Sequence, residues 1–214
     1  MHKSLTSLLM MAGLTVGTLF IPSADALAQG RTRVGVKGGL NASSLFYNVQ
    51  GVDTKKERIG FHAGVFAQAP LGEFFAIQPE LLYTTKGSSA NYNILAQGRN
   101  TFKLNYVELP VLATFKLGQS VELQAGPYVS YLLNSTLASE INGGGIRSLA
   151  INRDDLNKID YGLAGGLNFF LGKALVGLRY EQGLQRIAKS TAARAFLGDA
   201  KNGVGMISVG FSLN

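Results

Sequence analysis

The chain has 214 residues and no cysteine, which excludes disulfides, thiol catalysis, zinc–thiolate sites and a lipid-modified N-terminal cysteine. Its formal net charge of +7 is compatible with either nucleic acid or an anionic membrane surface as a partner. Only 15% of the residues are charged, compared with about a quarter in ordinary soluble domains, and glycine is abundant, with 27 residues.

Residues 1–28 contain the three parts of a secretory signal peptide. Lys3 gives the positively charged start, an apolar stretch follows it, and Ala26-Leu27-Ala28 is a small-x-small cleavage site. Polar residues come directly afterwards, which argues against an uncleaved membrane anchor, and no second apolar run of about 18 residues occurs. We therefore expect export of a single mature domain, residues 29–214, and exclude nucleic acid as its partner.

From Arg33 onward, apolar and polar residues alternate with a period of two, as in β-strands whose two faces meet different surroundings. Strands of about 11 to 15 residues are long enough to cross a membrane at a tilt, which takes about 9–11 residues, whereas ordinary globular strands average about 5–6. The pattern predicts eight such strands, at residues 33–45, 58–69, 74–86, 102–116, 121–134, 159–170, 174–184 and 203–213.

The connections between these segments alternate strictly in length. Those after the second, fourth and sixth strands are short, at residues 70–73, 117–120 and 171–173. The others are long, at residues 46–57, 87–101, 135–158 and 185–202. Tight periplasmic turns and long external loops are typical of outer-membrane barrels, and in lipid a sheet must close to pair all its backbone groups. The sequence thus predicts an all-β fold, an eight-stranded antiparallel up-and-down transmembrane β-barrel with both ends in the periplasm.

Aromatic residues on the apolar face are sorted by type. Tyrosines fall near the long-loop ends of the strands and phenylalanines near the short-turn ends, as in two interfacial belts. The residues are Tyr83, Tyr131, Tyr161 and Tyr180, and Phe75, Phe115, Phe169 and Phe211. Three prolines, Pro79, Pro110 and Pro127, count against central strands, because each lacks a ladder donor. We expect them at bulges or at non-bonded positions.

The polar face should line the barrel interior. Eight strands leave an interior that side chains can just fill, and buried charges need partners. The predicted interior network consists of Lys37, Glu80, Glu108, Glu122, Arg179 and Glu181. Two interpretations stay open: a polar plug, or a narrow path for ions or small solutes. The individual pairings cannot be read from the sequence.

No catalytic, metal or cofactor site is predicted. His62 is the only histidine after the signal peptide; it should face inward, and no serine is recognisably placed to pair with it. One histidine is too few ligands for a metal. The glycine-rich residues 142–145 lie in a long loop and do not lead from a strand into a helix, so we expect a flexible loop tip rather than a phosphate cradle.

The last long loop is basic, with a single acid, Asp199. Two interpretations are possible: a solvated loop, or a contact with the phosphates of lipopolysaccharide, since basic segments are drawn to anionic lipid. The candidate contact residues are Arg186, Lys189, Arg194 and Lys201.

Several segments resemble one known family. They are Gly35 to Asn41, Phe75 to Tyr83, Tyr106 to Leu112, Gly126 to Tyr128, Asp160 to Gly162 and Gly177 to Tyr180. Together they resemble the PorT-like outer membrane β-barrel proteins typical of Bacteroidetes, over essentially all of residues 33–214. The resemblance implies outer-membrane residence and no single activity. One departure is the ending Phe211-Ser212-Leu213-Asn214, because outer-membrane strands often end in an aromatic residue that the barrel assembly machinery reads.

The first functional hypothesis is a non-enzymatic outer-membrane protein with a structural or surface-interaction role. Its expected partners are outer-membrane lipid, lipopolysaccharide and, during insertion, the barrel assembly machinery. The alternatives are a narrow channel or transporter, a lipid-modifying barrel enzyme, or a PorT-like secretion accessory. The rival fold is a soluble periplasmic lipocalin-like barrel, which would need an apolar lumen and a polar exterior.

Overall fold

The computed structural model describes residues 32–46, 55–93, 97–141, 146–150, 155–191 and 199–214. The expected signal peptide, residues 1–28, and the glycine-rich residues 142–145 lie outside the described residues. In the described ranges, no helix is both long and apolar enough to cross a membrane.

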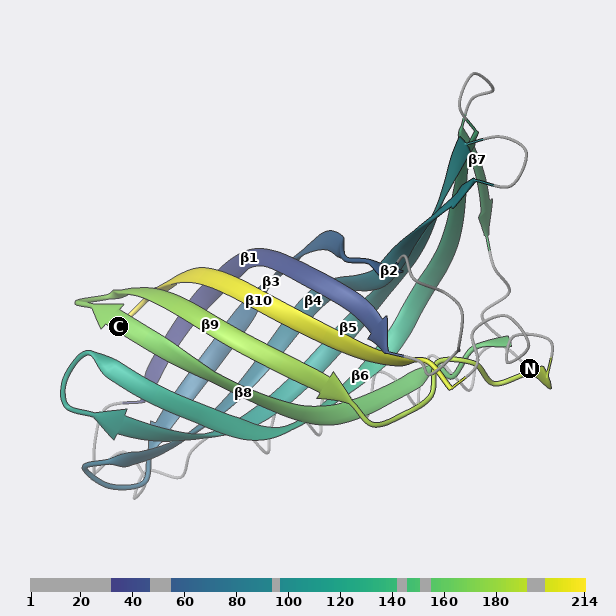
Figure 1. Ribbon diagram of the computed structural model, residues 1–214. Helices are drawn as coiled ribbons and strands as arrows, with labels where there is room; N and C mark the ends of the chain where they lie inside the picture. Colours follow the sequence, from purple (N-terminus) through teal and green to yellow (C-terminus); the bar gives the residue numbers. More distant parts are fainter. Residues whose placement is uncertain (1–31, 47–54, 94–96, 142–145, 151–154, 192–198) are drawn as a thin grey trace, which may run out of the picture.

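The described residues form one closed antiparallel β-barrel (Figure 1). Its eight long strands are β1 (Arg33–Phe46), β3 (Arg58–Pro70), β4 (Phe75–Asn93), β5 (Gln97–Leu117), β6 (Val121–Ile141), β8 (Ile159–Leu171), β9 (Ala174–Gly183) and β10 (Lys201–Ser212). The first strand pairs with the last as well as with its neighbour in sequence, so the barrel closes at the β1–β10 seam. The prediction of an eight-stranded up-and-down barrel is confirmed.

Three strands run further than the sequence predicted. The pairing of β4 with β5 continues from Lys86 and Leu104 as far as Asn93 and Gln97. Strand β6 is likewise extended and pairs with the short strand β7 (Ile146–Ala150), while β2 (Lys55–Lys56) pairs with β4. Figure 1 shows these extensions as an arm beyond the barrel at its long-loop end. The sequence did not predict these extensions because the period of two is marked only where one face of a strand is apolar and the other polar.

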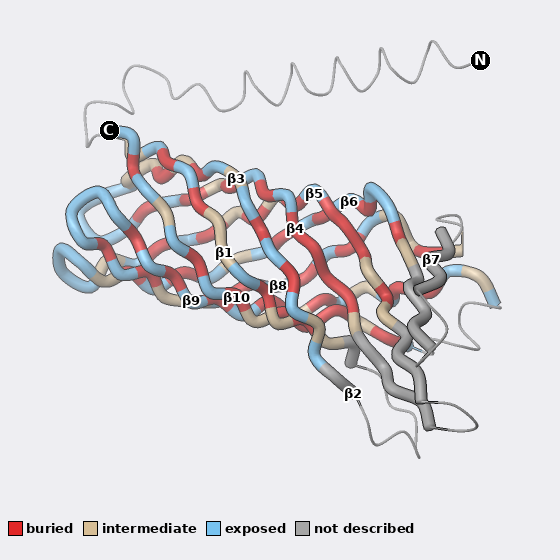
Figure 2. Tube along the Cα trace, turned by 90° about the horizontal axis from the view of Figure 1, so that it is seen from above, coloured by how far each residue is buried: buried red, intermediate tan, exposed pale blue. Residues whose placement is uncertain are grey.

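The barrel wall separates apolar and polar side chains as the alternation predicted. In β8, for example, Ile159, Tyr161 and Leu163 are 47–57% exposed, while Asp160 between them is buried. Figure 2 shows this alternation of exposed and buried residues along the strands. The outward face carries the apolar residues and the lumen carries the ionic ones, which is the inverse of a lipocalin-like barrel.

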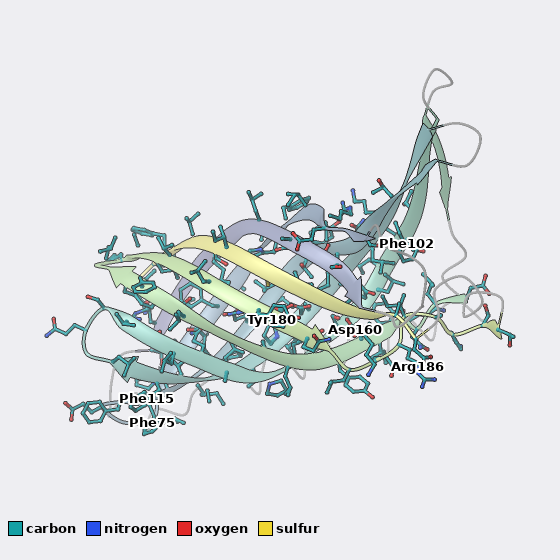
Figure 3. The ribbon with its side chains drawn as sticks, viewed as in Figure 1. Phe75, Phe102, Phe115, Asp160, Tyr180 and Arg186 are labelled. Atoms are coloured by element: carbon teal, nitrogen blue, oxygen red, sulfur yellow. The ribbon has the colours of Figure 1, made fainter. Side chains whose placement is uncertain are left out.

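The two aromatic groups point outward. Figure 3 shows Phe75 and Phe115 together at the short-turn end, with ring centroids 5.1 Å apart, and Tyr180 on the outer wall further along the barrel. All eight predicted belt residues are exposed, from 36% for Tyr83 to 57% for Phe75.

Each of the three strand prolines coincides with an interruption in a ladder. The β3–β4 register skips two positions on each strand at Pro79, the β4–β5 register does so at Pro110, and the β5–β6 register does so at Pro127. Because proline has no N–H to donate, the missing donor falls where the ladder is already broken. The expectation that these prolines occupy non-bonded positions therefore agrees with the structure.

Candidate functional site

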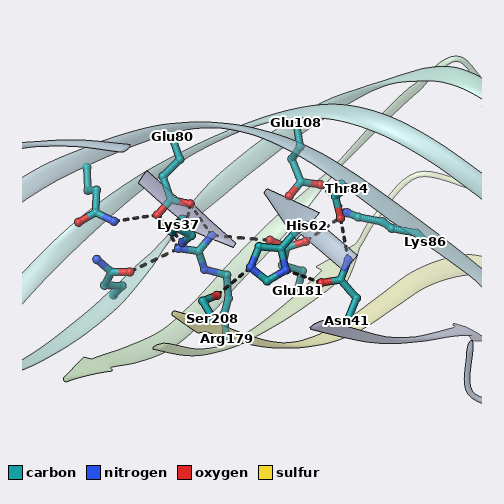
Figure 4. Close-up of polar contacts among 12 residues, drawn as sticks. Lys37, Asn41, His62, Glu80, Thr84, Lys86, Glu108, Arg179, Glu181 and Ser208 are labelled. Carbon is teal, nitrogen blue, oxygen red and sulfur yellow. Dashed lines mark hydrogen bonds and ion pairs between the residues drawn. The ribbon is translucent and has the colours of Figure 1, made fainter. Parts of the chain in front are cut away.

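The centre of the lumen holds a buried ion cluster (Figure 4). Arg179 of β9 donates two hydrogen bonds to Glu80 of β4, from Nη1 to Oε2 at 2.8 Å and from Nη2 to Oε1 at 2.7 Å. Lys37 of β1 lies 2.9 Å from the same carboxylate. All three residues are at least nine-tenths buried, so this arginine fork is a charge-assisted pair of the strong kind.

A second ion cluster lies nearer the long-loop end. Lys86 Nζ is 2.5 Å from Glu108 Oε2 and 3.1 Å from Glu181 Oε2. The ring of Tyr128 lies under the ammonium, 4.4 Å from it. Glu181 is also 3.9 Å from Arg179, which joins the two clusters.

A chain of amides continues the network toward the short-turn end. Gln78 donates to Glu80 at 2.7 Å, and Gln68 donates to Gln78 at 3.0 Å and to Glu122 at 2.7 Å. Arg33 completes the chain, 3.1 Å from Glu122. The structure thus links all six of the sequence-selected interior residues into one network.

The network has more members than the six predicted. Strand parity assigns Lys86 to the inward face, and the structure places it at the centre of the second cluster; Arg33, Gln68, Gln78 and Gln124 also contribute contacts. Only the alternation of faces along each strand could have indicated these residues, because each of their side chains falls on the inward face of its strand.

His62 is enclosed in the lumen wall. Its Nδ1 lies 2.6 Å from Asn41 Oδ1 and its Nε2 lies 2.8 Å from Ser208 Oγ, and all three residues are buried. The expectation that no serine pairs with His62 is wrong. The sequence could not indicate this pair because 146 residues separate its members and barrel closure brings them together. In the described part of the chain, no group of acidic, histidine or cysteine residues is arranged to hold a metal ion.

Apolar clusters cover the network at both ends. At the long-loop end, Leu156 and Ile187 from the loops pack on inward residues of β5 and β6, and Ile187 N donates to Ala200 O at 2.9 Å. At the short-turn end, Phe66, Phe170 and Leu175 form a cluster, with the Arg33 guanidinium 4.1 Å above the Phe170 ring. The sequence did not predict the first cluster, because its loop members follow no strand periodicity.

The basic residues of the last loop are partly described. Arg186 is exposed and pairs with Asp199 at 3.1 Å, and Lys189 is exposed. Lys201 is half-buried at the start of β10, and Arg194 lies outside the described residues. The structure therefore brings one of the four candidates, Arg186, into a contact with an acid.

Comparison with known proteins places this barrel in a family. The sequence model described as "Outer membrane protein beta-barrel domain" matches residues 24–189. The chain belongs to that family. As a member of the outer membrane protein β-barrel family, it resides in the outer membrane, and its outward apolar face meets lipid.

The solved structures that are similar to this chain are distant from it in sequence. Neisserial surface protein A has a TM-score of 0.51 at 12% identity, over 84% of this chain and 97% of that one. Ail of Yersinia pestis, in complex with the heparin analogue sucrose octasulfate, has 0.49 at 15% identity, over 85% and 99%. OprG of Pseudomonas aeruginosa has 0.41 at 15% identity, over 87% and 98%. The likeness to Neisserial surface protein A concerns the fold alone. No curated protein sequence matches the chain.

Proposed function

We propose that this barrel is a non-conducting, non-enzymatic outer-membrane protein with a structural or surface-interaction role. The observation that carries the proposal is the filled lumen, in which a continuous ion network lies between two apolar clusters. An ion path would need a water-filled column. Here Arg179, Glu80 and Lys86 form contacts between β4 and β9 inside the lumen, with their charges compensated by neighbouring side chains, so a permeating ion would have to displace them.

The enzyme alternative has one observation in its favour. Asn41, His62 and Ser208 form a chain in the order orienting group, base and hydroxyl, which is the arrangement of a nucleophilic triad. Against it, Ser208 faces the lumen and is only 4% exposed, so an acyl or phosphoryl substrate has no approach to its hydroxyl. We interpret the three residues as a structural hydrogen-bond chain that spans the β1–β10 seam and its neighbour β3.

Planar-bilayer recording tests the non-conducting role. Protein that is folded, as judged by heat-modifiable migration in gels, should give no unitary conductance steps after insertion. A variant with Leu156→Ala and Ile187→Ala, which opens the apolar cover, gives the comparison within the same scaffold. Clean, repeatable steps from the wild-type protein would contradict the proposal.

We further propose that the basic residues of the last loop contact lipopolysaccharide phosphates. Arg186 and Lys189 are exposed beyond the membrane-facing wall, on the side where lipopolysaccharide phosphates would lie. Replacing Arg186, Lys189, Arg194 and Lys201 with glutamine should reduce lipopolysaccharide co-purification. Lys173→Gln, at the opposite short-turn end, is the matched control for loss of a charge. Unchanged retention in the four-residue variant would rule out this contact.

Three remaining proposals rest on the sequence. They are removal of residues 1–28 on export, insertion by the barrel assembly machinery, and membership of the PorT-like subgroup. Amino-terminal sequencing of the outer-membrane form should begin at Gln29 if the first is right.

A further inference from the structure

The outer wall carries a groove in the half of the barrel nearer the long loops. It crosses β8, β9, β10, β1 and β3 and has a volume of about 570 Å³. Its exposed side chains are apolar and point away from the lumen: Leu40, Ile59 and Ile207 are 54–66% exposed. Asn41 and Arg179 also border it, but both are buried and belong to the lumen side of the wall. The groove therefore opens into the lipid and not into the interior network.

Residue size explains why the wall is hollow at this level. One cross-strand row consists of Ile59, Ala42, Gly205 and Tyr180, so two small residues lie between two large ones. The next row toward the short turns consists of Leu40, Ile207 and Leu178. These side chains are all large and close the end of the groove that is nearer the short turns.

The glycine at the floor is not required by the backbone. A Cβ on Gly205 would meet nothing nearer than the Ala42 carbonyl oxygen, at 3.9 Å. By contrast, a Cβ on Gly39 would lie 1.8 Å from the Ile207 carbonyl oxygen. The groove exists because Gly205 has no side chain, and a larger residue there would fill it without disturbing the barrel.

Basic residues lie above the open end of the groove. The loop that carries Arg186 and Lys189 connects β9 to β10, the strands of its flank and its floor. Figure 3 shows Tyr180 on the wall and Arg186 beyond the loop end. Lys201 begins β10, four residues before Gly205 and so about 13 Å along the strand, or roughly 9 Å along the membrane normal at the usual tilt. The Tyr180 hydroxyl donates to Gln182 Oε1 at 3.0 Å, as expected for a tyrosine at the membrane interface.

We propose that this groove holds an acyl chain of a phosphorylated, multiply acylated glycolipid of the lipid A class, with its phosphates at the basic residues above. The small residues at the floor of the groove, Ala42 and Gly205, accept the part of the acyl chain nearest the headgroup. Leu40, Ile207 and Leu178 contact the rest of the acyl chain. The phosphate contact rests on the proposed interaction of the last loop with lipopolysaccharide. The chain contact depends on the shape of the wall alone.

A single tryptophan can report on the groove because the chain contains none. We would place it with Tyr180→Trp and reconstitute the full mature barrel into bilayers of dibrominated phosphatidylcholine, whose acyl chains quench tryptophan fluorescence. Unbrominated lipid A, added at low mole fraction, should relieve the quenching because it replaces brominated phosphatidylcholine in the groove. We expect the groove to prefer lipid A over phosphatidylcholine on the order of tenfold, the combined effect of about one phosphate contact and a buried chain segment. Relief that only follows the bulk mole fraction would overturn the proposal.

Two further variants test the location. Gly205→Leu fills the groove and should lower the preference to the part that the phosphate contact contributes. Ala42→Leu fills the groove from the neighbouring strand if the first variant folds poorly. Gly165→Leu is the matched control, because Gly165 also pairs with Tyr180, faces outward and has open space around its Cβ, but lies outside the groove lining. The proposed site would be contradicted if Gly205→Leu kept the full preference for lipid A, or if Gly165→Leu lost as much of that preference as Gly205→Leu.

The lipid class and the loop contact are tested separately. Phosphatidylglycerol should not relieve quenching beyond its mole fraction, and a preference equal to that of lipid A would overturn the glycolipid assignment. In the reporter background, the four-residue loop variant and Gly205→Leu should each lower the preference, and the two combined should bring it to about one. If the loop variant retains lipopolysaccharide unchanged while Gly205→Leu still has its effect, the proposed loop contact is refuted and the proposed groove site stands.

Discussion

Arg179→Met tests whether the lumen is the dry, paired network that the contacts describe. The substitution removes both short hydrogen bonds to Glu80 and leaves that carboxylate with Lys37 at 2.9 Å and Gln78 at 2.7 Å. Breaking a buried ion pair from one side usually costs about 3–5 kcal/mol, because the remaining charge is only partly compensated. Since Glu80 keeps two partners, we expect a loss near the lower end, about 3 kcal/mol in the free energy of unfolding.

Arg179→Lys separates charge from geometry. Lysine keeps the positive charge but cannot form the two parallel bonds of the guanidinium, so its loss should be intermediate, about 1–2 kcal/mol. The surface pair of Arg186 and Asp199 has a similar contact distance, 3.1 Å, with side chains 50% and 66% exposed. Arg186→Gln should therefore cost less than about 1 kcal/mol.

Guanidinium unfolding of the barrel in phospholipid vesicles, followed by far-ultraviolet circular dichroism and by the heat-modifiable gel band, measures all three variants. The expected order of destabilisation is Arg179→Met, Arg179→Lys, Arg186→Gln. If Arg179→Met costs no more than Arg186→Gln, water screens the interior charges, and both the dry network and the non-conducting role inferred from it are refuted.

Three other substitutions have outcomes set by local geometry. Gly172→Ala, at φ +65 with open space around its Cβ, should lower the unfolding free energy by about 1–2 kcal/mol through backbone strain alone, which the same titration measures. Gly39→Ala should prevent closure of the β1–β10 seam, with loss of the heat-modifiable band, because of the 1.8 Å approach to Ile207. Ser208→Ala should cost about 1–3 kcal/mol by leaving His62 Nε2 without its partner, and should leave lipid A structure, read by mass spectrometry, unchanged.

The sequence predicted the barrel well because one alternation determines several features at once. The period of two identifies the strands, their outward face and the parity of the lumen residues, and the alternating loop lengths give the topology. Glu80 and Arg179 could be assigned to the interior in this way, although they lie 99 residues apart and their contact depends on the register of the closed sheet. Register comes from pairing across the barrel, which no local pattern contains.

The features that the sequence did not predict depend on loop packing or on the register between strands. Leu156 and Ile187 lie in loops, and their packing over the lumen follows from where β6, β8 and β9 end. Lys86 follows the parity rule, but its role between Glu108 and Glu181 depends on which strands face each other across the lumen. The groove requires the alignment of Ala42, Gly205 and Tyr180 across three strands, and so depends on register too.

The ionic interior has a role even in a barrel that conducts nothing. A slip of one residue in any strand would exchange its two faces, so that Lys37 or Arg179 would face the acyl chains. A lysine or arginine on the lipid face costs about 2–4 kcal/mol at the midplane, and a glutamate somewhat less. The network therefore specifies one register at the cost of several desolvated charges, which apolar lumen residues could not do. Because specification of the fold accounts for the interior residues, the residues free to serve a function are those outside it. They are the loops, and Gly205 on the wall, whose small size the fold does not need.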